Sequence, residues 1–292
     1  MARRILSALL CAGLLAGCGG NPFTEGTDGG GGETPGTGTI PAALKGNLQS
    51  VSYNPNGGAG GNGALTAVID PLDASPVTAT FDRAPTLDTP GYKAFTYRET
   101  SSNRLFVALL ATSASGDATA GVLGSGQFTE MVWGSTYQAD GFVKPQAGGL
   151  ASYKGNYVGI QNRGAAVPGP GAPFNPIQAY RVEGDVLLNA DFTNNSVEGG
   201  IRNRQVVDTS ETMADLFLQI TEIKADGTFG GTVVFADKSP SGTYGGAFGG
   251  TGATAVAGAI EVGPEKGNND LLERGIFVAD RCAPGDPLPC PQ

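Results

Sequence analysis

The sequence predicts an all-β protein whose strands curve strongly enough to form a small barrel. Beyond residue 40, apolar and polar residues alternate at a period of two, as in strands with one buried face. Glycine, asparagine, aspartate and proline interrupt these runs about every 8 to 12 residues, which is typical of turns between short strands. The chain also holds 48 glycines without a collagen repeat. Pairs such as Gly230-Gly231 and Gly245-Gly246 favour the bends of a barrel, whose closure removes exposed strand edges.

The alternating runs divide the chain into candidate strands. Asp226-Gly227 separates two of them and predicts a two-residue hairpin turn. One short helix is expected over Ser210–Asp215, because Ser210 can cap a turn that contains Glu211. The expected strands are Ala64–Ile69, Tyr92–Arg98, Leu105–Thr112, Ala120–Leu123, Gln127–Trp133, Gly155–Gln161, Ile177–Val182, Val186–Phe192, Val197–Arg202, Leu216–Ile223, Thr228–Phe235, Gly242–Phe248, Ala255–Val262 and Gly275–Asp280.

The first residues have the pattern of a bacterial lipoprotein signal peptide. A positive Arg3-Arg4 pair precedes the apolar run Ile5–Leu15, which at about 1.5 Å per residue is too short to cross a bilayer core of roughly 30 Å. Small residues precede the cysteine in Leu15-Ala16-Gly17-Cys18. We therefore expect residues 1–17 to be removed and Cys18 to become the lipidated, palmitate-bearing N-terminus. An ordinary secretory signal with an incidental cysteine is the alternative.

Residues 18–40 predict a disordered tether. They are rich in glycine, threonine and proline, and Phe23 is their one aromatic residue. Such a composition cannot bury enough apolar surface to offset the entropy of ordering, and roughly 20 flexible residues reach about 25 Å. Because Gly19 rather than aspartate follows the cysteine, we expect a lipid anchor in the outer membrane. The folded part would then lie at the cell surface or, alternatively, on the periplasmic face.

The charge of the chain argues against a nucleic-acid partner. The formal net charge is -9, and loss of the two arginines of the signal peptide makes it -11. Binding to phosphates requires clustered lysine and arginine, whereas the 18 basic residues here are scattered among 27 acidic ones. The length that remains after residue 17 suits two domains.

Cys282 and Cys290 form the cysteine pair that stays after Cys11 leaves with the signal peptide and Cys18 is lipidated. An exported chain meets an oxidising compartment, and the proline-rich and glycine-containing segment between the two cysteines favours a turn. We expect a structural disulfide that closes the tail 282–292. A redox or metal pair is the alternative, but the spacing is not Cys-x-x-Cys and no histidine is present to complete a zinc site.

The residue inventory disfavours catalysis. Without histidine, the chain lacks the commonest general base and metal ligand, so Ser-His-Asp and Cys-His mechanisms are excluded. Neither a Gly-x-Ser-x-Gly nor a Ser-x-x-Lys motif occurs. We expect no enzyme activity, no cofactor and no bound metal. A hydrolase that uses two carboxylates brought together by the fold is the remote alternative.

Four glycine-rich segments of the second half follow one another in an order typical of one family. They match, in turn, a Gly-x-Tyr/Trp-x-Gly strand, an acidic-Phe strand with its turn, a lengthened glycine-rich hairpin without its usual glutamate, and a closing Gly-x-Phe-x-Ala strand. With these segments, residues from about 150 to 281 resemble the β-barrel domain of the transferrin-binding protein B superfamily of surface lipoproteins, which includes the factor H binding proteins. The segments are Gly155–Gly159, Asp191–Gly200, Gly242–Gly258 and Gly275–Ala279.

The resemblance implies an antiparallel barrel of about eight strands over residues 151–281, filled by side chains, and a smaller β-rich, handle-like domain over residues 41–150. It also implies a non-catalytic binding lipoprotein whose barrel loops recognise a protein or nutrient ligand, with iron and haem carriers among the candidates. Transferrin itself is not implied, because the chain has one lobe rather than two. A structural envelope lipoprotein that faces the periplasm is the alternative.

One aromatic side chain is a candidate for contact with a partner, and one group of charged side chains is expected to be only solvated. Phe174 ends the proline-rich segment Pro168–Pro176 and could be presented to a ligand, or it could pack over the mouth of the barrel. Arg202 and Arg204, beside Glu198, are expected to form a solvated charged face of small energetic worth.

Overall fold

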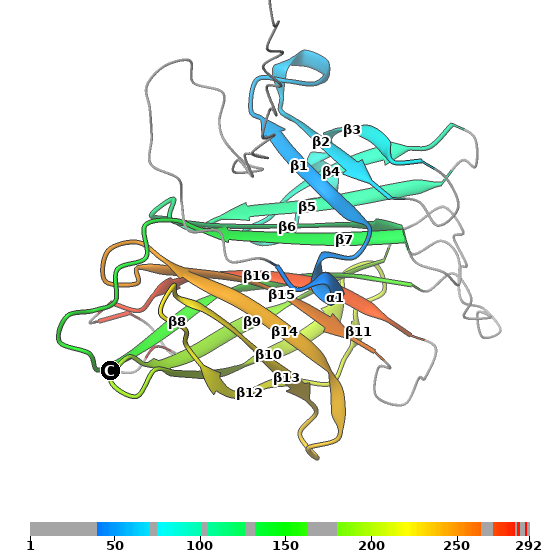
Figure 1. The fold of residues 1–292 in the computed structure, drawn as a ribbon. Helices are drawn as coiled ribbons and strands as arrows, with labels where there is room; N and C mark the ends of the chain where they lie inside the picture. Colours follow the sequence, from blue (N-terminus) through cyan, green and yellow to red (C-terminus); the bar gives the residue numbers. More distant parts are fainter. Residues whose placement is uncertain are drawn as a thin grey trace, which may run out of the picture.

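The chain folds into two antiparallel sheets that lie against each other (Figure 1). The structure is a computed structural model that describes residues 40–70, 75–100, 104–125, 132–162, 180–263, 271–283, 285–286 and 290. Its regular structure is almost entirely β, with α1 (Ala42–Lys45) as the one α-helix of the described residues, so the predicted all-β class is confirmed. No helix in these ranges is long and apolar enough to cross a membrane.

The first sheet is a meander in which consecutive strands pair from β1 to β7. Its two edges nearly meet, because Gly46 before β1 forms an isolated bridge with Gly134 in β7. A Cβ at Gly134 would lie 2.2 Å from the Cβ of Leu48, so only glycine permits this approach. The strands are β1 (Leu48–Asn54), β2 (Ala64–Ile69), β3 (Val77–Arg83), β4 (Lys93–Arg98), β5 (Leu105–Thr112), β6 (Ala118–Ser125) and β7 (Val132–Ala139).

Eight strands of the second sheet close into the antiparallel barrel that the resemblance implies. Strand β10 pairs with β12 on one side and with β9 on the other, which completes the circuit through β8 and β16. The interior is filled by side chains, among them the fully buried Tyr153, Phe192 and Phe248. The barrel strands are β8 (Leu150–Gln161), β9 (Tyr180–Asp191), β10 (Ser196–Val206), β12 (Leu216–Glu222), β13 (Thr228–Val234), β14 (Pro240–Gly249), β15 (Ala255–Val262) and β16 (Glu273–Arg281). The ninth strand of the sheet, β11 (Glu211–Thr212), pairs only with the end of β10.

Two local expectations in the barrel are wrong. The segment Ser210–Asp215 is not a helix, because Ser210 has a φ of 56° and the next two residues form β11, which pairs with the end of β10. The hairpin at Asp226-Gly227 has a three-residue loop rather than a two-residue one. The N–H of Lys224 donates to the carbonyl of Thr228, and Gly227 takes the left-handed conformation with a φ of 82°, as in a turn followed by a bulge.

The two sheets share one apolar layer, which explains why several strands are apolar at every position. Alternate residues of β5 point to opposite faces: Phe106 and Leu110 pack inside the first sheet, whereas Val107 and Leu109 pack between the sheets. The barrel covers its side of this layer with both branched and small apolar side chains. They are Val158, Ile160, Ala247, Ala255, Ala257, Ala259, Ile276 and Val278.

Tyr92, the residue immediately before β4, connects the first sheet to the barrel wall by hydrogen bonds. Its buried hydroxyl donates to the carbonyl of Asn156 at 2.8 Å and accepts the N–H of Val278 at 3.1 Å, so it bridges the backbones of β8 and β16. Burial raises the pKa of Tyr92 far above its ordinary value, and the hydroxyl therefore stays protonated.

Replacing Tyr92 with Phe is expected to lower the free energy of unfolding by about 1 to 3 kcal/mol, because a backbone donor and acceptor lose their partner in a buried place. Urea unfolding followed by tryptophan fluorescence measures the change. Tyr97→Phe is the matched control, since Tyr97 is half-buried and its hydroxyl makes no hydrogen bond within the described residues. Equal losses in the two variants would contradict a fastening role for Tyr92.

Candidate functional site

An open groove of about 680 Å³ crosses the outer wall of the barrel. Strands β8, β9, β10 and β12 form its floor, and the segment that follows β16 lies beside β8, because the N–H of Cys282 donates to the carbonyl of Ser152. The groove is lined by Leu150, Ala151, Ser152, Asn189, Ala190, Asp191, Ser196, Glu198, Ile220, Arg281, Cys282 and Ala283.

The pairing register places the outward side chains of the floor in rows. Ser152 lies opposite Asn189, which in turn lies opposite Glu198. The hydroxyl of Ser152 donates to Asn189 Oδ1 at 2.7 Å, which fixes two neighbouring side chains of the row. The aliphatic side chains of Leu150 and Ile220 rise from this polar floor and are 81% and 68% exposed.

Ile220 reaches the groove because β12 contains a β-bulge. Leu216 and Leu218 point into the barrel, and a regular strand would send Ile220 there as well. Between its pairings with Gly200 and Ser196 of β10, however, β12 holds one more residue than its partner. The extra residue reverses the alternation, and Ile220 points outward.

The charge of the groove is negative. Hydrogen bonding by the side chain of Asn194 holds the pKa of Asp191 below its ordinary value, so this carboxylate is ionised at neutral pH. Glu198 is exposed and has no ion-pair partner among the described residues. The guanidinium of Arg281 is directed to the carbonyl of Gly252 at 2.7 Å rather than to either carboxylate.

Arg204 does not belong to the solvated charged face that the sequence predicts; it is fully buried inside the barrel. The register of β10 with β9 shifts after Arg202, where Asn203 has a φ of 53°. This bulge turns Arg204 inward. Its Nη2 lies 2.9 Å from Oε2 of Glu273, and neither side chain is exposed. Arg202 and Glu198 remain exposed, as predicted.

Neutral groups complete the buried network around Glu273. This carboxylate accepts hydrogen bonds from the hydroxyl of Tyr157 and from Nε2 of Gln161, the latter at 2.7 Å. Nη1 of Arg204 donates to the carbonyl of Ala214. Within the described ranges Glu273 is the one buried carboxylate, so this part of the chain holds no buried carboxylate pair of the kind that glycosidases use.

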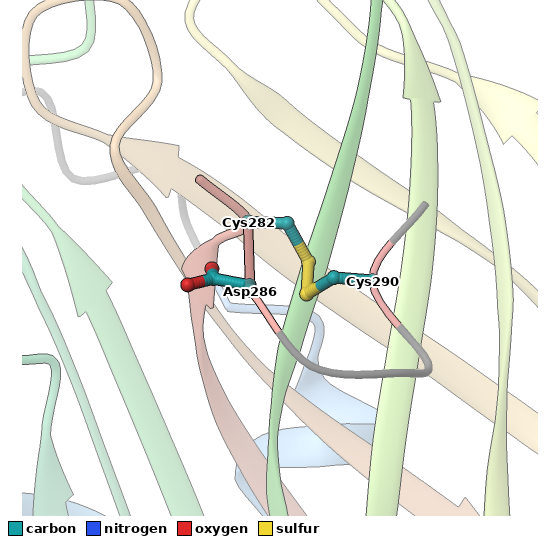
Figure 2. A group of neighbouring side chains, drawn as sticks. All are labelled: Cys282, Asp286 and Cys290. Carbon is teal, nitrogen blue, oxygen red and sulfur yellow. A yellow bond between two sulfur atoms is a disulfide. The ribbon is translucent and has the colours of Figure 1, made fainter. Parts of the chain in front are cut away.

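Cys282 and Cys290 form the expected disulfide, with their Cα atoms 5.7 Å apart (Figure 2). Asp286 lies beside them, and its carboxylate accepts the N–H of Ala283 at 2.6 Å. Sulfur atoms joined in a disulfide are not the thiolates that zinc requires. The three residues therefore close the tail in this state and do not provide a metal site.

The groove is lined by residues that no sequence pattern marks as functional. Leu150 and Ile220 read as ordinary members of β-type runs, and nothing in the alternation marks the bulge that exposes Ile220. The expected lipidation residue Cys18 and the candidate ligand residue Phe174 lie outside the described residues.

The architecture is that of a filled, eight-stranded antiparallel barrel beside a nearly closed seven-stranded sheet. No protein-family model matches the chain, and no curated protein matches it. Solved structures of transferrin binding protein B are similar to it. With intact Ap-TbpB, which has N and C lobes, the identity is 13% and the TM-score 0.40, over 75% of this chain and 52% of that one.

Two further structures give comparable values. A double mutant of the protein from Haemophilus parasuis Hp5 has 14% identity and a TM-score of 0.41, over 75% of this chain and 50% of that one. The isotype 1 protein from serogroup B Neisseria meningitidis has 15% identity and a TM-score of 0.37, over 80% of this chain and 52% of that one. The chain thus spans about half the length of the solved structures it matches.

Proposed function

We propose that this chain is a non-catalytic binding lipoprotein, anchored in the outer membrane through Cys18 and displayed at the cell surface. The observation that carries the proposal is the organisation of the barrel. Its interior is packed with side chains, and its open groove lies on the outer wall. Recognition would therefore use the outside of the barrel, with a protein or a nutrient carrier as the ligand.

The proposal assigns a role to each part of the chain. Residues 1–17 are the signal peptide, 18–40 the tether, 41–150 the handle-like domain, 151–281 the barrel and 282–292 the disulfide-closed tail. The apolar layer between the sheets and the bridge made by Tyr92 support a rigid platform. A preorganised surface loses little conformational entropy when it binds, which favours a binding role.

Lipid anchoring is tested by labelling cells with a palmitate analogue and separating membranes from soluble proteins. The natural chain is expected to carry the label and to stay with the outer membrane. Cys18→Ala is expected to abolish the label and to release the chain into the soluble fraction. Cys282→Ser serves as the control for loss of a cysteine as such, and it should keep the label. An unlabelled natural chain would contradict the proposed anchor.

Surface display is tested on intact cells with a broad protease and an epitope placed after Gln292. We expect loss of the epitope while a periplasmic marker protein survives. Survival of both would contradict the receptor role and favour a structural lipoprotein that faces the periplasm. Loss of both would mean that the cells had leaked, and the treatment is then repeated at a lower protease dose until the marker is intact.

A further inference from the structure

We propose that the groove on the outer wall of the barrel receives a polypeptide segment of a partner, and that this segment presents an apolar side chain next to a lysine or arginine. The inference rests on the proposed binding function and adds the surface and the chemistry of the partner to it. It locates recognition on the strand faces of β8, β9, β10 and β12 rather than on the barrel loops.

Two aliphatic side chains of the groove are strongly exposed. Leu150 and Ile220 are 81% and 68% exposed and line the same groove. The other large exposed hydrophobic residues of the described ranges, Val77 and Val143, are 38% and 48% exposed and do not line it. Single exposed apolar side chains are common, but two of them in one rigid groove mark a surface that a partner covers.

A β-bulge in β12 exposes Ile220. A regular β12 would direct this side chain into the barrel beside Leu218, where burial would stabilise the fold. The β-bulge instead turns it to the outside, which gives up that stabilisation. Bulges that aim a side chain out of the regular alternation are frequent next to functional sites, and this one points into the groove.

The carboxylates of the groove favour a cationic group on the partner. Asp191, Glu198 and Arg281 line the groove, and the guanidinium of Arg281 donates to the carbonyl of Gly252 and forms no ion pair with either carboxylate within the described residues. A cationic side chain of the partner would meet Glu198 at the groove, whereas an acidic one would be repelled. An apolar contact flanked by a charged one fixes both the position and the direction of a bound segment.

The shape of the groove suits an extended segment better than a small molecule. Pockets for small molecules enclose most of their ligand, whereas this groove is open along the outer wall of a barrel. Its floor is a continuous hydrogen-bonded ladder from β8 through β9 to β10, so the groove is preformed. An extended segment can lie along such a floor and reach both Leu150 and Ile220 without rearrangement.

The test uses the full-length chain and three fluorescein-labelled octapeptides in a fluorescence anisotropy titration. The first peptide alternates lysine with leucine, the second replaces each lysine by glutamate, and the third replaces each leucine by serine. We expect the lysine-leucine peptide to bind most tightly, since it alone supplies both chemistries. Equal affinity of the lysine-leucine and lysine-serine peptides would overturn the apolar part of the proposal.

Groove variants establish where the peptide binds. Leu150→Ser combined with Ile220→Ser is expected to weaken binding roughly tenfold or more, and Glu198→Gln a few-fold with a smaller dependence on salt. The matched controls are Val77→Ser and Asp82→Asn, which change an exposed aliphatic and an exposed acidic residue of β3 in the first sheet. They should leave the affinity within about twofold.

Far-UV circular dichroism checks that all variants fold, as expected for exposed positions. If groove and control variants weaken binding equally, or not at all, the groove assignment is wrong. The protease experiment on cells is independent of this result. If the chain is displayed at the surface but the groove does not bind the peptide, the inference is refuted and the proposed function stands. If the chain is protected from the protease but the groove binds the peptide, the proposed surface display is refuted and the inference stands.

Discussion

Replacing Glu273 with Gln is expected to lower the free energy of unfolding by about 3 to 5 kcal/mol, because it removes the buried carboxylate that pairs with the buried guanidinium of Arg204. Both side chains are fully buried, and Nη2 of Arg204 lies 2.9 Å from the carboxylate. Water cannot reach the cation to replace the lost partner. Urea unfolding, followed by circular dichroism and tryptophan fluorescence, measures the loss.

A double variant separates the charge interaction from packing. Arg204→Met together with Glu273→Gln removes both charges, and the glutamine still offers an acceptor to the hydroxyl of Tyr157. We expect the double variant to be more stable than Glu273→Gln alone, with a coupling free energy of about 1 to 3 kcal/mol between the two positions. Strictly additive losses would show that the two charges do not stabilise each other.

The period-two alternation predicts most strands of the barrel, since one face of each strand packs on a filled interior. The strand Leu105–Thr112 is also predicted, although its apolar run is unbroken and does not alternate. The structure gives the reason for that run: β5 is buried on both faces, between the interior of the first sheet and the barrel. Alternation does not predict β1, where a register shift after Leu48 disturbs the pattern, or β3, where only Ala79 and Phe81 are buried.

The features that matter most for the candidate site depend on bulges, and bulges are set by cross-strand register that a single strand does not reveal. Strict alternation along β10 places Arg204 in solvent, whereas the left-handed Asn203 turns it into the core. Strict alternation along β12 buries Ile220, whereas the bulge exposes it. One added residue reverses every later side chain of a strand, so both departures from strict alternation have the same physical cause.

Replacing Phe248 with Ala is expected to lower the free energy of unfolding by about 3 to 5 kcal/mol, the range for a buried aromatic side chain whose removal leaves a cavity. Phe248 is fully buried in the barrel. Its ring lies 5.1 Å from those of Tyr153 and Phe229 and 5.3 Å from that of Phe192, so several aromatic contacts are lost together.

The same substitution tests whether the two sheets unfold as one unit. The chain's single tryptophan, Trp133, packs against the layer between the sheets and reports on that layer, whereas circular dichroism reports on all strands. Because the layer and the Tyr92 bridge join the sheets, Phe248→Ala in the barrel and Phe106→Ala inside the first sheet should each shift one common transition, seen identically by both probes. Two separate transitions in either variant would mean that each sheet is stable without the other. The groove would then sit on a barrel that moves independently of the handle-like sheet, rather than on one rigid platform.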